Sequence, residues 1–277
     1  MATHESIDGL IIRTKDMGDH DRYLTVLTAE RGRIPMLAKG GRSLKGPQTA
    51  VSQLYTYANF EYYRRGDFNI LKGGSPIESF YRLAEDMDRV NLAAYLCDLT
   101  AELTDEGEEA GDMLRLILNS LHAISRDLYP LEQVKGAFEL KAAALAGYEP
   151  DLSGCRVCRK TDSDPFYLDV MNGALLCPAC LSEAGRHARG GEYADEIREA
   201  EIRPVLSAAV TAAMRHCLQA PVNRLFAFRF ADPNDLAQFA KHAEIYLLSH
   251  LGHGFESLRF FHDLRSPAAI PEKEDPK

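Results

Sequence analysis

Two pairs of cysteines with the spacing of a tetrahedral metal site constrain this chain more than any other feature. Cys155 and Cys158 form one Cys-x-x-Cys pair, Cys177 and Cys180 form the second, and 18 residues separate the two pairs. Each pair makes a tight turn that presents two sulfur atoms to one point, and four thiolates suit zinc, with Zn–S distances of about 2.3 Å. The spacing therefore predicts a zinc module, with one ion, within residues 150–184.

The span between the two cysteine pairs predicts a small β-hairpin that brings the second pair back to the first. Its apolar strands are Phe166–Val170 and Gly173–Leu176. A site with four cysteine ligands has no open coordination position, so the predicted zinc ion is structural. A redox role for Cys177-Pro-Ala-Cys180 is the alternative, but that role needs a thioredoxin-like strand–helix context.

Short apolar and β-branched runs at roughly ten-residue spacing dominate residues 6–75. They are Ile7–Ile12, Tyr23–Thr28, Ile34–Ala38, Leu54–Tyr63 and Phe68–Lys72. Glycine-containing turns separate them. Five short strands without long helices predict a small closed barrel, and an OB-fold is a five-stranded barrel of this size. Another small barrel would fit the same pattern.

From Leu83 onward the apolar residues recur at helical spacing. Three amphipathic helices are predicted, over 83–103, 114–124 and 134–145, and the acidic run 105–109 is interpreted as a solvated connection between the first two. Two more helices are expected at about 204–218 and 234–251. Gly147 follows the third stripe as a C-cap. The zinc module is therefore inserted in a helical bundle.

These elements predict an α+β multidomain chain. The expected parts are an OB-fold barrel at 1–80, a helical domain at 81–149, the zinc module at 150–184, a second helical part at 185–262 and a disordered tail at 263–277. A flexible link is expected at 185–202. No run approaches 18 apolar residues and the start lacks a signal peptide, so we expect no membrane association and a cytoplasmic location.

The charge of the chain is unevenly distributed. The total is −9, yet residues 1–82 carry +3 and the remainder carries −12. Residues 31–45 hold five basic side chains and no acid. Charges more than about 10 Å apart are largely screened at 0.1 M salt, so an acidic protein can bind a polyanion through a local basic face. The alternative is that these cations only solvate the surface of a strand.

Aromatic side chains lie next to this basic stretch and have two interpretations. Tyr55, Tyr57, Phe60, Tyr62 and Tyr63 occupy one predicted strand, and Arg64 and Arg65 follow it. Aromatic rings on the outer surface of a barrel would suit stacking on single-stranded bases. Rings that point inward would form the barrel core. The sequence favours the cations over any single tyrosine as contacts of a nucleic acid.

The sequence contains none of the common enzymatic signatures. GxSxG, HExxH, the Walker A pattern and the dinucleotide-binding fingerprint are all absent. We therefore predict that the chain is not an enzyme. Two other functions stay open: a different zinc-containing module that binds single-stranded nucleic acid, related to RNA or transcription, and a redox enzyme that uses a Cys-x-x-Cys pair.

The order of these parts resembles the RecO family of bacterial recombination mediators. Gly18–Thr28 with Glu30–Arg33 resembles the first hairpin of the family, and Ala38–Arg42 resembles its basic barrel loop. Leu131–Tyr148 resembles its central helix, and His250–His253 matches a typical C-terminal segment. The resemblance covers about residues 1–262 and includes the position of the four cysteines.

This resemblance implies a function in DNA repair at the nucleoid. Members of the family bind single- and double-stranded DNA, anneal complementary strands and help load a recombinase onto strands coated by single-strand binding protein. They act with RecR and in many bacteria with RecF, and they contact the acidic tail of single-strand binding protein. We expect the helical bundle to supply an apolar notch with nearby cations for that tail.

The same resemblance assigns the site residues. The DNA contacts that it implies are Arg33, Lys39, Arg42 and Lys45, with Arg64 and Arg65 second, and the zinc ligands are Cys155, Cys158, Cys177 and Cys180. The family often has two basic residues where this chain has only Arg42 before Ser43, so the patch is thinner here. Reversing Arg33, Lys39 and Arg42 to Glu is predicted to abolish DNA binding without unfolding the chain.

Overall fold

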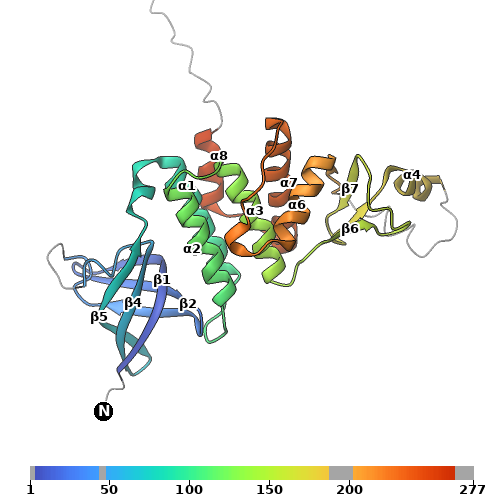
Figure 1. Cartoon of the computed structure of the whole chain (residues 1–277). Helices are drawn as coiled ribbons and strands as arrows, with labels where there is room; N and C mark the ends of the chain where they lie inside the picture. Colours follow the sequence, from blue (N-terminus) through green and yellow to red (C-terminus); the bar gives the residue numbers. More distant parts are fainter. Residues whose placement is uncertain (1–3, 44–47, 187–201, 266–277) are drawn as a thin grey trace, which may run out of the picture.

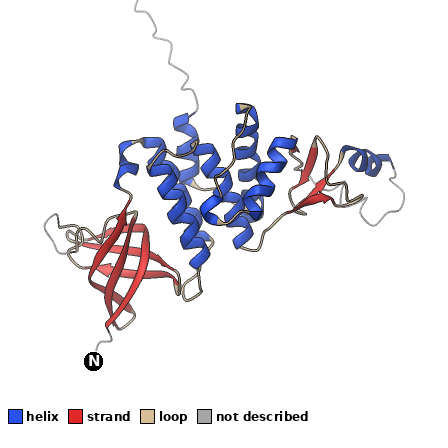
Figure 2. Cartoon of the chain, in the orientation of Figure 1, coloured by secondary structure: helices blue, strands red, loops and turns tan. Residues whose placement is uncertain are grey.

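The computed structural model describes residues 4–43, 48–186 and 202–265. The chain forms three parts in a row: an N-terminal β-barrel, a central helical bundle, and a small sheet with a helix that carries the cysteines (Figure 1, Figure 2). The predicted α+β architecture, with the cysteine module inserted in the helical part, is confirmed.

The barrel consists of five strands, β1 (His4–Met17), β2 (Asp21–Thr28), β3 (Gly32–Ala38), β4 (Thr56–Arg65) and β5 (Phe68–Ser79). They close in the order β1-β2-β3-β5-β4, with β3 and β5 parallel and the other pairs antiparallel. The predicted OB-fold barrel is confirmed. β1 is longer than its apolar run because its first half pairs with β4 and its second half pairs with β2.

The outer wall of the barrel is buried against the helical bundle. Leu10, Ile11 and Ile12 are consecutive and almost fully buried, and successive residues of a strand point to opposite faces. Ile11 belongs to the interior core of the barrel, whereas Leu10 and Ile12 belong to the core of the bundle. Leu27 and Tyr55 join the same bundle core. A strand that is buried on both faces therefore explains the apolar run.

The loop between the first two helices is attached to the barrel and is not the solvated connection that the sequence predicted. Arg33 N donates to Asp105 O at 3.1 Å, and Ala110 N donates to Ala29 O at 2.8 Å. Gly32 adopts φ +56° at this contact, and a Cβ there would lie 1.9 Å from Asp105 O. The turn between β2 and β3 is thus fixed to the bundle by backbone hydrogen bonds, and only glycine fits at its centre.

The bundle contains the three predicted helices, α1 (Met87–Glu102), α2 (Gly111–Ser125) and α3 (Leu131–Leu145), after a short 3-10 turn, η1 (Tyr81–Glu85). Its second part comprises α6 (Ala208–Gln219), η2 (Val222–Arg224), α7 (Pro233–Leu251) and α8 (Glu256–Arg265). The described helices are each too short or too polar to cross a lipid bilayer.

Two details of the second helical part differ from the sequence predictions. The helix expected from residue 204 begins at Ala208, because Val205–Leu206 form strand β9. Helix α8 was not predicted, and it includes residues 263–265 of the expected tail. The rest of that tail, and residues 187–201 of the expected link, lie outside the described residues.

The cysteine module is built on a small sheet of order β6-β8-β7-β9. β6 spans Asp151–Cys155, and the predicted hairpin is present as β7 (Phe166–Asp169) and β8 (Ala174–Leu176), which pair antiparallel. Helix α4 (Pro178–Arg186) follows the hairpin. The sheet shares one continuous apolar core with the bundle. The stability of the module and that of the bundle are therefore coupled.

A buried lysine lies between a buried and a partly buried carboxylate where α3 meets α7. Lys135 is 2% exposed, and its Nζ lies 2.9 Å from Glu139 Oε1 and 2.5 Å from Glu244 Oε2. Tyr95 OH on α1 donates to Glu139 Oε1 at 2.7 Å. Burial raises the pKa of Glu139 to about 7, although the neighbouring Lys135 ammonium opposes this rise. The lysine therefore compensates the buried Glu139 and the partly buried Glu244 at once.

Replacing Lys135 by Met is expected to cost about 3–5 kcal/mol of unfolding free energy, because the fully buried Glu139 carboxylate loses its cation, whereas the partly buried Glu244 keeps His262. The pKa of Glu139 is higher in the folded than in the unfolded protein, so its ionisation lowers the free energy of unfolding as pH rises. Removing Lys135 raises the folded pKa of Glu139 further and strengthens this effect. Denaturant unfolding should therefore show a larger loss at pH 8 than at pH 5. Lys241→Met, on an exposed position of α7, is the control. Equal losses at both pH values would contradict this assignment.

Candidate nucleic-acid interface and metal centre

OB-folds bind oligonucleotides on the outer face of strands 2 and 3 and on the β1–β2 and β4–β5 loops. Here those loops are residues 18–20 and 66–67. We call the outer surface of β2 and β3 between these two loops the barrel face. The position of each predicted DNA-contact residue relative to the barrel face decides how it can act.

Lys39 and Arg42 lie beside the β1–β2 loop. Gly40 N donates to Asp21 Oδ1 at 2.8 Å and Arg42 N donates to His20 O at 3.1 Å, so the chain after β3 is tied to this loop. The Arg42 guanidinium pairs with Asp16 at 3.2 Å and donates to Gly18 O at 2.7 Å. Arg42 thus braces the loop, whereas Lys39 is exposed and forms no ion pair with a described residue.

Arg64 and Arg65 are exposed on the strand that enters the β4–β5 loop. Arg64 is paired with Asn69 of β5, and Asn69 is in turn paired with Met36 of β3. The pairing of β4 with β5, and of β5 with β3, therefore brings both arginines to the edge of the barrel face. Neither forms an ion pair with any residue that the structure describes, although Arg64 Nε donates to Gly66 O at 3.3 Å.

Arg33 is held by the helical bundle. Its guanidinium lies 3.7 Å from the Asp105 carboxylate, and its backbone N–H donates to the carbonyl of the same residue. Asp105 is 72 positions away in sequence, so no local sequence pattern predicts this contact. Lys45 lies outside the described residues. The four cations predicted first thus have different environments, and reversing Arg33 or Arg42 would also break contacts within the protein.

Two exposed lysines near the barrel face were not predicted from the sequence. Lys15 on β1 is paired with Tyr23 of β2. Lys72 follows the parallel pairing of β3 with β5. The alternation of side chains along a strand could have indicated that Lys15 is exposed, since Arg13 and Lys15 point to the same side of β1. Both lysines extend the set of cations that a polyanion would meet.

The aromatic strand is mainly a core element. Tyr55, Phe60 and Tyr62 are buried, and Phe60 and Tyr62 belong to the interior cluster of the barrel. Tyr62 OH also donates to Glu5, which pairs with Arg31. Burial raises the pKa of Tyr62 to about 12, so its hydroxyl stays protonated at neutral pH. Of the five aromatic residues named above, only Tyr57 and Tyr63 are partly exposed.

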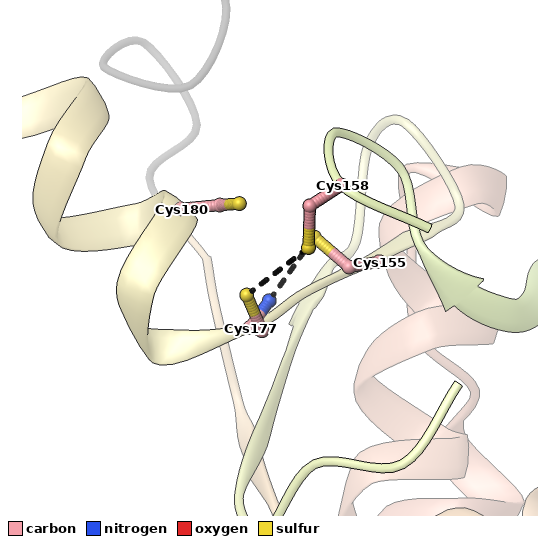
Figure 3. A group of neighbouring side chains, drawn as sticks. All are labelled: Cys155, Cys158, Cys177 and Cys180. Carbon is pink, nitrogen blue, oxygen red and sulfur yellow. Dashed lines mark hydrogen bonds between the residues drawn. The ribbon is translucent and has the colours of Figure 1, made fainter. Parts of the chain in front are cut away.

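The four cysteine side chains of the module converge (Figure 3). Cys155 ends β6, Cys158 lies on the turn after it, Cys177 follows β8, and Cys180 lies in α4. Their sulfur atoms all lie within 4.8 Å of one another, and Cys158 Sγ is 3.7 Å from Cys177 Sγ. A tetrahedral site with Zn–S distances of about 2.3 Å has sulfur–sulfur separations of about 3.8 Å. The donor set and its size therefore fit one tetrahedral metal ion.

The local environment favours a thiolate in this cluster. Burial raises the pKa of the Cys155 thiol, but backbone hydrogen bonds from the turns at Cys158 and Cys177 outweigh this effect and bring the pKa to about 7. Cys177 N donates to Cys155 Sγ at 3.4 Å. The fully buried Cys155 and nearly buried Cys177 and Cys180 exclude water from one side of the cluster. Burial raises the pKa of the Cys177 and Cys180 thiols, so Cys155 is the cysteine that these interactions favour as a thiolate, the form in which cysteine binds a structural zinc ion.

Comparison with known proteins gives a consistent result over most of the chain. Residues 1–80 match the family model described as Recombination protein O N terminal, and residues 84–194 match Recombination protein O C terminal. The boundary between the two matches lies at η1, where the barrel ends and the bundle begins.

Three individual relatives agree with these matches. The chain is 28% identical to the DNA repair protein RecO of Acetivibrio thermocellus over 92% of this chain and 95% of that protein. It is 31% identical to the protein of the same name from Alkaliphilus metalliredigens, over 62% of this chain and 70% of that protein. The identity to the Halalkalibacterium halodurans protein is also 31%, over 64% and 68% of the two chains.

Proposed function

The chain belongs to the RecO family of DNA repair proteins, and from this premise we propose that it anneals complementary strands and helps load a recombinase onto single strands coated by single-strand binding protein. The observation that carries the proposal is the barrel face of the OB-fold, at whose edges the exposed Lys39, Arg64 and Arg65 lie. Such proteins work with DNA on the chromosome, so we place this one in the cytoplasm, at the nucleoid.

The proposed action is physical. Cations on the barrel face neutralise phosphates and release counterions, which makes affinity fall as salt rises. Because exposed cations outnumber exposed aromatic rings there, the protein holds strands mainly by their backbones and leaves the bases free to pair. No covalent step is needed, and we propose that the protein is not an enzyme. Single- and double-stranded DNA are both ligands in this view.

The partners of the proposal are RecR, RecF and single-strand binding protein. For the acidic, apolar-ended tail of single-strand binding protein we propose the bundle surface at Met87 and Leu128, which are 65% and 53% exposed. The ion pair between Arg89 and Asp127, at 3.1 Å, holds these two segments together, and Arg126 is exposed nearby. An apolar patch beside arginines suits such a tail.

We further propose that the four cysteines hold one structural Zn²⁺. When bound, the ion would cross-link β6 and its turn to the start of α4. A redox role for Cys177 and Cys180 is disfavoured because all four sulfur atoms share one site. Membership of the RecO family likewise favours DNA repair over an RNA or transcription module.

Annealing of two complementary strands precoated with single-strand binding protein tests the proposal. We expect this protein to accelerate duplex formation, and we expect the acceleration to weaken between 50 and 200 mM salt, following counterion release. Strand pairing is followed with a fluorophore and quencher on opposite ends, and non-complementary strands are the control. A folded, zinc-loaded protein that leaves the annealing rate unchanged would contradict the mediator function.

A further inference from the structure

A cavity of about 390 Å³ lies between the outer face of β1–β2 and helix α1. Its walls include the side chains of Tyr23 and Leu54, and Ala94 closes it from α1. Leu54 is 38% exposed, whereas Tyr55 is 9% exposed and buried among apolar residues. The lining is mainly apolar, and the volume falls within the range of small-ligand sites.

The cavity is open because of one small residue and one ion pair. Ala94 and Asp98 are the residues of α1 that line it, and a bulky apolar side chain in place of Ala94 would narrow the space. Arg13 Nε and Nη2 donate to Asp98 Oδ1 at 3.1 and 2.9 Å. The second oxygen of Asp98 accepts from Ser257 of α8 at 2.8 Å. Asp98 thus fixes the distance between the barrel, α1 and α8 at the rim.

The position of the cavity connects it to the barrel face. Lys15 and Tyr23 are directly paired across β1 and β2, and Met17 and Asp21 close this hairpin at the β1–β2 loop. The cavity is therefore next to the loop that Arg42 braces. Lys15 is exposed on its rim and pairs with no described acid, so one cation is available beside an aromatic wall.

We propose that this cavity accepts one unstacked base of a single-stranded nucleic acid, with its face against Tyr23 and its phosphate on Lys15. This inference rests on the proposed DNA binding and adds a pocket to it. Base stacking on an aromatic ring tolerates every sequence, because all bases have a π face. An acidic peptide is a poorer fit, since Lys15 is the one exposed cation on the rim that pairs with no described acid, which suits a single phosphate beside an aromatic wall better than a tail with several carboxylates.

Filling the cavity with Ala94→Leu tests the proposal. Affinity is measured for a single-stranded oligonucleotide, for an abasic strand of equal length and for a duplex. We expect the variant to bind the single strand about fivefold to a hundredfold more weakly, corresponding to one lost stacking contact. Its affinity for the abasic strand and for the duplex should be unchanged, because neither offers a free base. Ala94→Ser, which leaves the cavity open, should behave like the original protein.

A second variant reports on the cavity directly. The chain contains no tryptophan, so Tyr23→Trp introduces a single indole emission into the cavity wall. We expect a normal single strand to quench this emission and the abasic strand to leave it unchanged. This measurement still tests the proposal if the Ala94→Leu variant does not fold.

The possible outcomes separate the pocket from the proposed function. Two results would overturn the base pocket. One is an Ala94→Leu variant that binds the duplex and the abasic strand as weakly as it binds the normal single strand. The other is a Tyr23→Trp variant whose emission does not depend on the presence of bases. Unchanged DNA affinity together with weaker binding of an acidic, apolar-ended peptide would assign the cavity to a peptide and also overturn it. Failure of the original protein to bind any form of DNA would instead contradict the proposed function.

Discussion

Replacing Cys177 by serine is expected to abolish metal binding and to unfold the cysteine module. Cys177 is 3% exposed, and its sulfur lies 3.7 Å from that of Cys158. Structural zinc sites in small peptides supply about 10–16 kcal/mol of binding free energy at pH 7, comparable to the whole stability of a typical domain. Because the module and the bundle share one core, the loss should reach α6 and α7.

Bound zinc is measured by release to a chromogenic chelator, and stability by thermal unfolding. A chelator should lower the melting temperature of the original protein but should have no further effect on the serine variant. Cys217→Val is the matched control, since Cys217 is equally buried but lies outside the cluster, and it should keep one zinc ion. Full zinc content and an unchanged melting temperature in Cys177→Ser would refute the metal site.

Reversing Lys39, Arg64 and Arg65 to Glu is expected to reduce DNA affinity on the order of a thousandfold. A charged hydrogen bond contributes at least about 1.5 kcal/mol, close to tenfold in affinity for each lost phosphate contact. The slope of log affinity against log salt should become shallower by about 0.9 for each contact that is lost. Single- and double-stranded DNA should both be affected, since the contacts are made to phosphates.

This set replaces the reversal of Arg33, Lys39 and Arg42 that the sequence suggested. Arg33 and Arg42 make ion pairs with Asp105 and Asp16, so their reversal would change the fold as well as the charge. Lys241→Glu is the control, because it reverses one charge on an exposed position of α7, away from the barrel. Should the triple variant be folded and bind DNA with unchanged affinity and salt dependence, the assignment of the barrel face would be wrong.

The features that the sequence predicted are those with a local signature. The cysteine spacing located the metal site, glycine turns and β-branched runs located the barrel strands, and helical periodicity located α1, α2 and α3. Helix α8 was missed although Leu258, Phe261 and Leu264 recur at helical spacing, because the segment is short and adjoins the proline-rich, charged end of the chain that was interpreted as a tail. Polar contacts hold it in place, including Ser257 with Asp98 and His262 with Glu244.

The candidate DNA-binding site was harder to predict, because the charge of an arginine or lysine does not show whether its side chain is free to contact DNA or is paired within the protein. The partners of Arg33 and Arg13 lie on the loop before α2 and on α1, far away in sequence. Only the tertiary structure separates these paired arginines from the exposed Lys39. The cavity at Ala94 is likewise formed between two parts of the chain, so neither part contains a pattern that indicates it.

The buried outer wall of the barrel has a consequence for aggregation. In a fragment that ended near residue 80, Leu10, Ile12 and Leu27 would lose the bundle that covers them and would form an exposed apolar stripe on a β-sheet. The hairpin turn at Ala29–Arg33 would also lose its hydrogen-bonding partners on the loop before α2. Such surfaces favour self-association of sheets. The bundle therefore acts as a solubilising cover for the barrel, and the two are expected to be produced and handled as one unit.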